Sequence, residues 1–171
     1  MFRWQCATRA LHTYTDSDWA GDKTTRKSTS GGIAFLVVHC IKSWSTNQTI
    51  IALSSAEAEL YALLKGASQA LGLKSMAADF GDDLEAGLWS DASAAIAISQ
   101  RSGLGKLRHI QNKFLWLQER VSAKDLQLTK VQGTANPADM LTKHLAKADL
   151  DKHLEFSGCL LYTSPSPRDR G

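Results

Sequence analysis

Cysteine and proline are scarce in this sequence, and no hydrophobic run is long enough to span a membrane. The three cysteines are scattered and odd in number, so we expect neither a thiolate metal site nor a disulfide framework, and we expect an intracellular protein. The longest apolar run, residues 31–41, falls short of the roughly 20 residues that a membrane helix needs and contains His39. No apolar segment follows Arg3 and Arg9, so we expect no signal peptide.

The sequence also has no large excess of charge of one sign, but its charges are unevenly distributed. An apolar content of 43% and a charged content of 22% are typical of one globular domain and exclude a disordered, collagen-like or coiled-coil chain. Residues 1–50 carry six basic and three acidic side chains, residues 51–100 two and seven, and residues 101–150 nine and four. An acidic middle between basic flanks suits a protein that binds a polyanion, and it suits a merely solubilising surface as well.

Hydrophobic periodicity predicts five strands and four helices. The strands are expected at residues 11–16, 31–40, 41–46, 86–91 and 126–131, from alternation or short apolar runs. The helices are expected from residue 54, over residues 92–100 and 109–124, and from residue 136 through Leu141 and Leu145. The order β-β-β-α-β-α-α-β-α predicts an α/β fold with a mixed five-stranded sheet and helices on both faces.

Two glutamates near the start of the first expected helix have different roles. Ser54 and Glu57 form the S-x-x-E pattern of a capping box, in which each side chain satisfies a free backbone N–H of the first turn. Glu59 lies two residues further on and therefore points to the opposite helix face. Glu59 is the glutamate left free for chemistry.

Four carboxylates stand where sites collect in α/β sheets. Asp16 lies near the end of the first expected strand, Asp91 at the end of the fourth, and Glu59 and Asp139 in early turns of helices. Carboxylates gathered at one place repel each other unless cations hold them, and oxygen ligands suit Mg²⁺ or Mn²⁺. Taken singly, Asp91 also fits a helix N-cap, and Asp139 also fits an acidic residue at a helix N-terminus.

Five segments carry a family resemblance. They read, in chain order, YTDSDWAGDKTTRKSTSGG, ALSSAEAELYAL, LWSDASAAIAI, RHIQNKFLWLQER and NPADMLTKHL. The sequence closely resembles the C-terminal ribonuclease H domain of copia-type (LTR) retrotransposon Pol polyproteins. The resemblance covers roughly residues 12–157. It implies the ribonuclease H fold, in agreement with the order of strands and helices.

The resemblance implies a metal-dependent endonuclease that hydrolyses the RNA strand of RNA–DNA hybrids. It maps the family's metal-binding carboxylates onto Asp16, Glu59, Asp91 and Asp139, which would hold two Mg²⁺ ions, with Asp16 bridging both. Asp18 shares a strand face with Asp16, so it could stand beside Asp16 and support it, or it could itself be the metal ligand in place of Asp16. The reverse transcriptase part of the parent polyprotein is the expected partner. We expect a monomer as an isolated domain, located in a cytoplasmic particle or the nucleus.

Basic and hydroxyl side chains are candidates for holding the hybrid. Ser54 and Ser55, beside Glu59, are expected to contact 2′-hydroxyls. The backbone contacts are expected from the four basic residues Arg26, Lys27, Arg108 and Lys113. His109 fits either a phosphate or substrate contact or a partly exposed histidine at a helix start.

Two departures from the family pattern leave a second interpretation open. Thr134 stands near the place where many ribonucleases H have a loop histidine, although the copia branch commonly lacks that histidine. Gln111 follows the RHI tripeptide, where copia elements often have an aspartate. The alternative function is therefore a catalytically decayed nucleic-acid-binding relic or scaffold domain of the same polyprotein. A nuclease of the same fold that cleaves duplex DNA is a third interpretation.

The two ends of the chain are expected to lie outside the domain. Residues 1–11 are interpreted as a lead-in, residues 12–157 as the ribonuclease H-like domain and residues 158–171 as a disordered tail. The segment CLLYTSPSPRD contains two of the three prolines and has no periodicity. It resembles translated sequencing-adapter sequence, and a natural Ser/Pro-rich tail is the alternative.

Overall fold

A computed structural model of the chain describes residues 9–102 and 113–158. The strands are β1 (Ala10–Asp18), β2 (Thr29–Leu36), β3 (His39–Asn47), β4 (Glu85–Ser90) and β5 (Gln127–Lys130). The α-helices are α1 (Ser55–Asp79), α2 (Ser93–Gln100), α3 (Lys113–Ser122) and α4 (Lys147–Phe156). Two short 3₁₀ helices, η1 (Gly133–Ala135) and η2 (Pro137–Leu141), lie between β5 and α4.

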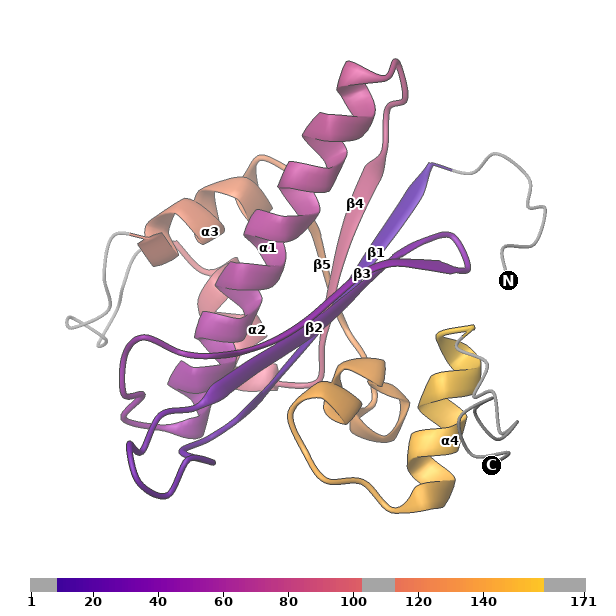
Figure 1. Cartoon of the computed structure of the whole chain (residues 1–171). Coiled ribbons are helices and arrows are strands. Elements are labelled where there is room, and N and C mark those ends of the chain that lie inside the picture. The colour runs from indigo at the N-terminus through magenta and orange to yellow at the C-terminus, as the bar shows by residue number, and fades with distance from the viewer. Residues whose placement is uncertain (1–8, 103–112, 159–171) are drawn as a thin grey trace, which may run out of the picture.

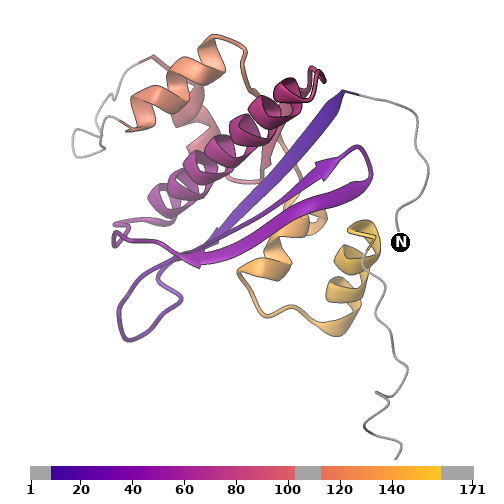
Figure 2. The same cartoon turned by 45° about the horizontal axis from the view of Figure 1, so that its top comes forward.

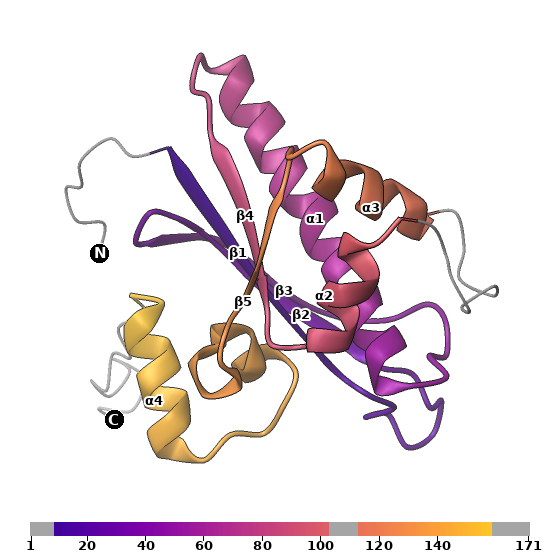
Figure 3. The ribbon, with the colours of Figure 1, turned by 180° about the vertical axis from the view of Figure 1, so that it is seen from behind.

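The strands form one mixed sheet in the order β3-β2-β1-β4-β5 (Figure 1). β1, β2 and β3 pair antiparallel, whereas β4 lies parallel to β1 and β5 parallel to β4. Figure 3 shows this part of the sheet from behind, with β4 between β1 and β5. This confirms the mixed five-stranded sheet expected from the sequence. It also brings the carboxyl ends of β1, β4 and β5 to one edge of the sheet, as their parallel course requires.

Helices cover both faces of the sheet. Helix α1 lies on one face with α2 and α3 nearby, and α4 lies on the opposite side (Figure 2). The first face is the main apolar core, in which Leu11, Leu88 and Phe114 are fully buried. On the other face, the ring of Phe156 in α4 lies 6.1 Å from Tyr14 and 5.3 Å from Phe35, between ring centroids.

Helix α1 begins where the sequence predicts and packs closely on β1. The Ser54 side chain caps it by accepting a hydrogen bond from the Glu57 N–H, and Glu57 in turn accepts from the Leu53 N–H at 2.8 Å. Gly66 permits the close packing, because a methyl group there would lie 2.3 Å from Cγ2 of Thr15. In residues 9–102 and 113–158, we find no helix with the length and apolarity that a membrane crossing requires.

Two element boundaries differ from the sequence prediction. The apolar run 31–40, expected as one strand, turns at residues 37–38, where Val37 has a φ of 58° and its N–H bonds the Ala10 carbonyl. The single helix expected from residue 136 is interrupted: η2 ends at Leu141, and α4 begins only at Lys147. Asp139 therefore lies in a short 3₁₀ turn rather than in the first turn of a long helix.

Candidate active site

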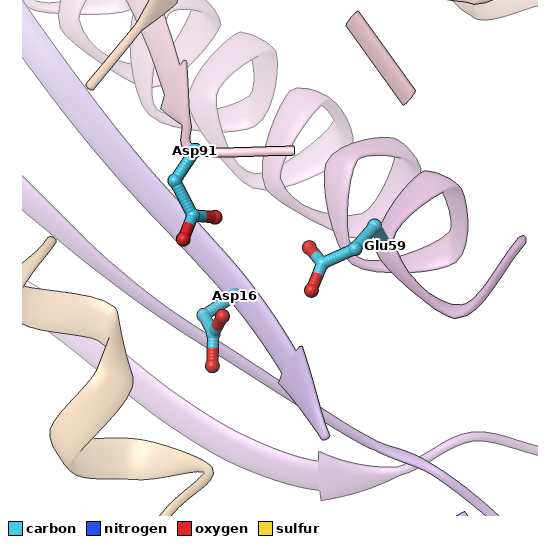
Figure 4. Close-up of side chains that lie close together, drawn as sticks. All are labelled: Asp16, Glu59 and Asp91. Atoms are coloured by element: carbon cyan, nitrogen blue, oxygen red, sulfur yellow. The ribbon is translucent and has the colours of Figure 1, made fainter. Parts of the chain in front are cut away.

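Three carboxylates meet where β1 and β4 reach the edge of the sheet. Asp16 lies in β1, Asp91 comes one residue after β4, and Glu59 comes from the second turn of α1 (Figure 4). One oxygen of each lies within 4.8 Å of the others. Three segments far apart in the sequence thus contribute to one edge, because α1 starts at the end of the sheet where β1 stops.

Asp16 is the most enclosed of these carboxylates, with only 1% of its side chain exposed. Its two oxygens accept hydrogen bonds from Thr142 and, at 3.0 Å, from the Lys143 ammonium. The pKa of Asp16 is raised to about 6: burial is the largest cause and the charge of Asp139 adds to it, while Thr142 and Lys143 oppose the rise.

Glu59 carries an unsatisfied oxygen. Its Oε1 accepts a hydrogen bond from the Ser17 N–H at 3.2 Å, whereas its buried Oε2 has no hydrogen-bond partner among the described residues. The pKa of Glu59 is raised to about 8, chiefly by burial and in addition by the negative charges of Asp16 and Asp91. An ionised Glu59 is therefore costly here unless a cation approaches it.

Asp139 reaches the same region from the opposite side, on η2. The turn is anchored by Asn136, which is completely buried, donates to the Thr15 carbonyl at 3.0 Å and accepts from the Ala138 N–H. Burial raises the pKa of Asp139, with the ion pair to Lys143 opposing the rise. Asp139 lies outside the group of three, but Lys143 links its carboxylate to that of Asp16.

Thr142 and Lys143 are site residues that the sequence analysis missed. The Lys143 Nζ lies 3.0 Å from Oδ1 of Asp16 and 3.3 Å from Oδ1 of Asp139. Burial opposes its charge, but the two carboxylates outweigh burial and raise the pKa of Lys143 to about 12. The spacing of four between Asp139 and Lys143 was a usable signal for an ion pair. The link to Asp16 was not visible, because 127 positions separate the two residues.

The donor set fits hard divalent cations. All the contributing groups are carboxylates, which are the ligands that Mg²⁺ and Mn²⁺ accept readily. The orphaned Oε2 of Glu59 lies among them without a proton donor from the described chain. A cation beside it would satisfy that oxygen and offset the repulsion between Glu59, Asp16 and Asp91.

Asp18 has a different position from Asp16, although both lie on β1. Its carboxylate accepts a hydrogen bond from the Thr29 N–H, directly across the start of the β1–β2 hairpin. A methyl group on Gly21 would collide with its Oδ2 at 1.8 Å. Asp18 thus braces the hairpin and is not a member of the carboxylate group.

The residues predicted to contact nucleic acid lie in different places. Arg26 and Lys27 are in the β1–β2 loop, and Ser54 and Ser55 are exposed at the start of α1, all at the sheet edge that carries Asp16. Lys113 instead begins α3, with its Nζ 4.4 Å from the ring centroid of Tyr61. Arg108 and His109 lie outside the described residues.

The comparisons with known proteins agree with this architecture. The chain is 34% identical over 150 residues to the retrovirus-related Pol polyprotein from transposon TNT 1-94 of Nicotiana tabacum, covering 86% of this chain. It is 29% identical over 143 residues to the Pol polyprotein from transposon RE1 of Arabidopsis thaliana, covering 82% of this chain. This chain is a relative of retrotransposon Pol polyproteins. The resemblance inferred from the five sequence segments is therefore confirmed.

A solved structure identifies the fold. The ribonuclease H1 named LC11, isolated from compost by a metagenomic approach, superimposes with a TM-score of 0.55 at 16% identity, covering 86% of this chain and 99% of that one. The ribonuclease H fold is therefore also confirmed. No protein-family model matches the chain. The chain spans only 11% and 10% of the lengths of the tobacco and Arabidopsis relatives.

Proposed function

We propose that this retrotransposon domain is a metal-dependent ribonuclease H, which hydrolyses the RNA strand of RNA–DNA hybrids. The observation that carries the proposal is the meeting of Asp16, Glu59 and Asp91 within 4.8 Å at the edge of a ribonuclease H fold. Three carboxylates this close repel each other, one of them has a buried oxygen without a partner among the described residues, and such costly arrangements are typical of functional sites. We propose the reverse transcriptase part of a parent polyprotein as the source of the hybrid.

Divalent cations at this site would be held by Asp16, Glu59 and Asp91, with Asp139 as a further ligand. Bound there, Mg²⁺ would lower the pKa of an attacking water and stabilise the negative charge that develops at the scissile phosphate. The protein's own part is to hold the carboxylates in place beforehand. The Ser17 N–H orients Glu59, and Asn136 ties the turn of Asp139 to β1 through the Thr15 carbonyl.

Recognition of the hybrid is proposed for the side chains around this cluster. Ser54 accepts a hydrogen bond as the N-cap of α1, which leaves its own O–H free to donate to a 2′-hydroxyl or a phosphate oxygen. Arg26 and Lys27 lie in a loop that is braced by Asp22, whose carbonyl accepts from the Arg26 N–H and whose N–H bonds the Lys27 carbonyl. The loop lies at the end of the sheet that carries Asp16, and from there both cations would contact the phosphate backbone.

The decisive experiment is cleavage of a labelled RNA–DNA hybrid with Mg²⁺ and with EDTA. We expect cleavage of the RNA strand with Mg²⁺ only, and no cleavage of duplex DNA. The Asp16→Asn variant should lose at least about a hundredfold in rate, because it removes a buried ligand charge at nearly constant shape. The matched variant Asp18→Asn should retain cleavage, since Asp18 only braces the hairpin.

The result separates the proposed nuclease from its alternatives. Hybrid binding without cleavage by the wild type would instead support a decayed relic that retains nucleic-acid binding. Cleavage of duplex DNA in preference to the hybrid would support a different nuclease of the same fold. If folded Asp16→Asn keeps more than about a tenth of the wild-type rate, Asp16 is not a metal ligand of this reaction.

A further inference from the structure

Lys143 occupies the gap between two of the proposed metal ligands. Its ammonium lies 3.0 Å from Asp16 and 3.3 Å from Asp139, so one positive charge serves two carboxylates. With Thr142 on the other oxygen of Asp16, both oxygens of that carboxylate are engaged by the segment that follows η2. η2 thus supplies Asp139, and the segment directly after it supplies the cation that neutralises this carboxylate.

The carboxylate cluster is divided by this arrangement. On one side, Glu59 and Asp91 face Asp16, and Oε2 of Glu59 has no hydrogen-bond donor within the described part of the chain. On the other side, the space between Asp16 and Asp139 already holds a cationic group. A divalent ion entering the second side would meet the ammonium at the same oxygens, and like charges that close repel strongly.

Lys143 is also able to leave. Its side chain is 40% exposed, whereas that of Asp16 is 1% exposed. A lysine carries its charge on a flexible four-carbon stem, so the ammonium can move into solvent while the backbone stays in place. The backbone N–H of Lys143 is held independently, by the Asp139 carbonyl at 3.0 Å.

We propose that Lys143 is a resident counter-ion for the Asp16–Asp139 pair, which a second divalent cation must displace, so that the two sides of the cluster bind metal with unequal affinity. The inference rests on the proposed function, because it concerns metal loading of the same site. Lys143 acts here as a positioning residue: without metal it holds the two carboxylates together, and with metal it retreats. The side of Glu59 and Asp91 is expected to fill first.

The test is a titration of the full chain with Mn²⁺ alone, in which electron paramagnetic resonance measures the concentration of free ion at each step. The wild type should show a tighter and a weaker binding class. Lys143→Met, which keeps the length but not the charge, should tighten the weaker class by roughly tenfold and leave the tighter class nearly unchanged. Lys143→Arg keeps the charge and should behave as wild type. The exposed Lys147, at the start of α4, provides the matched control Lys147→Met, which should leave both classes unchanged.

Thermal stability gives a second readout of the same idea. In EDTA, Lys143→Met should melt below the wild type, because Asp16 and Asp139 lose their shared cation; Mn²⁺ should raise its melting temperature more than it raises that of the wild type. If Lys143→Met does not fold, Lys143→Gln provides the same comparison.

An unchanged Mn²⁺ affinity of the weaker class in a folded neutral variant would overturn the inference, even if the protein is an active nuclease. If the wild type does not cleave hybrids, the proposed function fails, but the difference in Mn²⁺ affinity between the wild type and the neutral variant would still support the role of Lys143.

Discussion

Glu59 shows what a single buried carboxylate costs when no cation accompanies it. Its pKa of about 8 in the folded chain compares with an ordinary value of 4.5, and burial is the main cause. The folded state therefore binds a proton that the unfolded state releases over this range. Asp16, with a pKa of about 6 against 3.8, acts in the same direction.

The metal-free protein should consequently lose stability as pH rises. The contribution of a raised carboxyl pKa is complete below the unfolded value and disappears as pH rises through the folded value. We expect the melting temperature in EDTA to fall from about pH 5 to about pH 8, and Glu59→Gln to flatten this fall because the amide does not titrate. Mg²⁺ should reverse it in the wild type. A melting temperature that is equally steep in Glu59→Gln would show that the pH dependence originates elsewhere.

At this scale the sequence predicts which carboxylates gather better than it predicts the side chains around them. Asp16, Glu59 and Asp91 were predicted from their places at strand ends and an early helix turn, and the structure brings these three together. The contacts of Lys143 with Asp16 and of Asn136 with the Thr15 carbonyl were not predicted. Such contacts depend on how η2 packs against the sheet, and no local periodicity records that packing.

Among the elements, η2 depends on a glycine in the neighbouring strand. A methyl group on Gly31 of β2 would lie 2.6 Å from Cγ2 of Thr142, 3.0 Å from Cβ of Leu141 and 3.2 Å from the Ala138 carbonyl oxygen. Two of these atoms belong to side chains close to the backbone, and the third is backbone. The turn that carries Asp139 and Lys143 can therefore lie this close to β2 only because residue 31 lacks a side chain.

Gly31→Ala should accordingly displace η2. We expect a loss of roughly 1 to 3 kcal/mol in the free energy of unfolding, from overpacking, and weaker Mn²⁺ binding because Asp139 and Lys143 move with the turn. Gly72→Ala is the matched control. Apart from the nearby turns of α1 itself, no atom of the described residues lies within 4 Å of a methyl group at that position, and alanine there should stabilise the helix by about 0.5 to 1 kcal/mol. Urea unfolding of both variants measures the contrast; equal effects would contradict the close approach of η2.

Element boundaries were predicted less well than element types, for a local reason. The turn that separates β2 from β3 consists of Val37 and Val38, which are β-branched residues that favour strands. No glycine or proline marks this turn in the sequence. Likewise, Leu141 and Leu145 have helical spacing, yet the chain leaves η2 at Thr142, whose hydroxyl bonds Asp16. In both places a tertiary contact determines the backbone, against the local pattern.

For the whole molecule, the acidic middle of the sequence is separated by the topology. Glu57 and Glu59, in the first two turns of α1, and Asp91, directly after β4, lie at the edge where β1 and β4 end. The remaining acidic residues of that region, Asp79, Asp82, Asp83 and Glu85, follow α1 to its far end and the start of β4, at the opposite edge (Figure 1). The acidic middle therefore does not form a single face. We expect this charge to repel a polyanion from the far edge; at the near edge, Arg26, Lys27 and the cations proposed for the carboxylates would attract it.

Salt dependence should report which edge holds the hybrid. Neutralising Arg26 and Lys27 together should weaken hybrid binding and flatten the slope of log affinity against log salt by roughly one to two units. The reason is that binding releases fewer counterions when fewer phosphates are contacted. The rate at saturating hybrid should change little, since these side chains would bind the ground and transition states alike.

The matched control neutralises Lys74, in the last turns of α1, and Lys124, two residues after α3. Lys74 lies near the C-terminal end of α1, and Lys124 lies shortly before β5 begins. Both are at the end of the sheet opposite to Asp16, so their neutralisation should leave the salt slope unchanged. Equal slopes in wild type and in the folded Arg26/Lys27 variant would contradict backbone contacts by this loop. The positioning of the hybrid would then depend on Ser54, Ser55 and the metal ions proposed for the carboxylates.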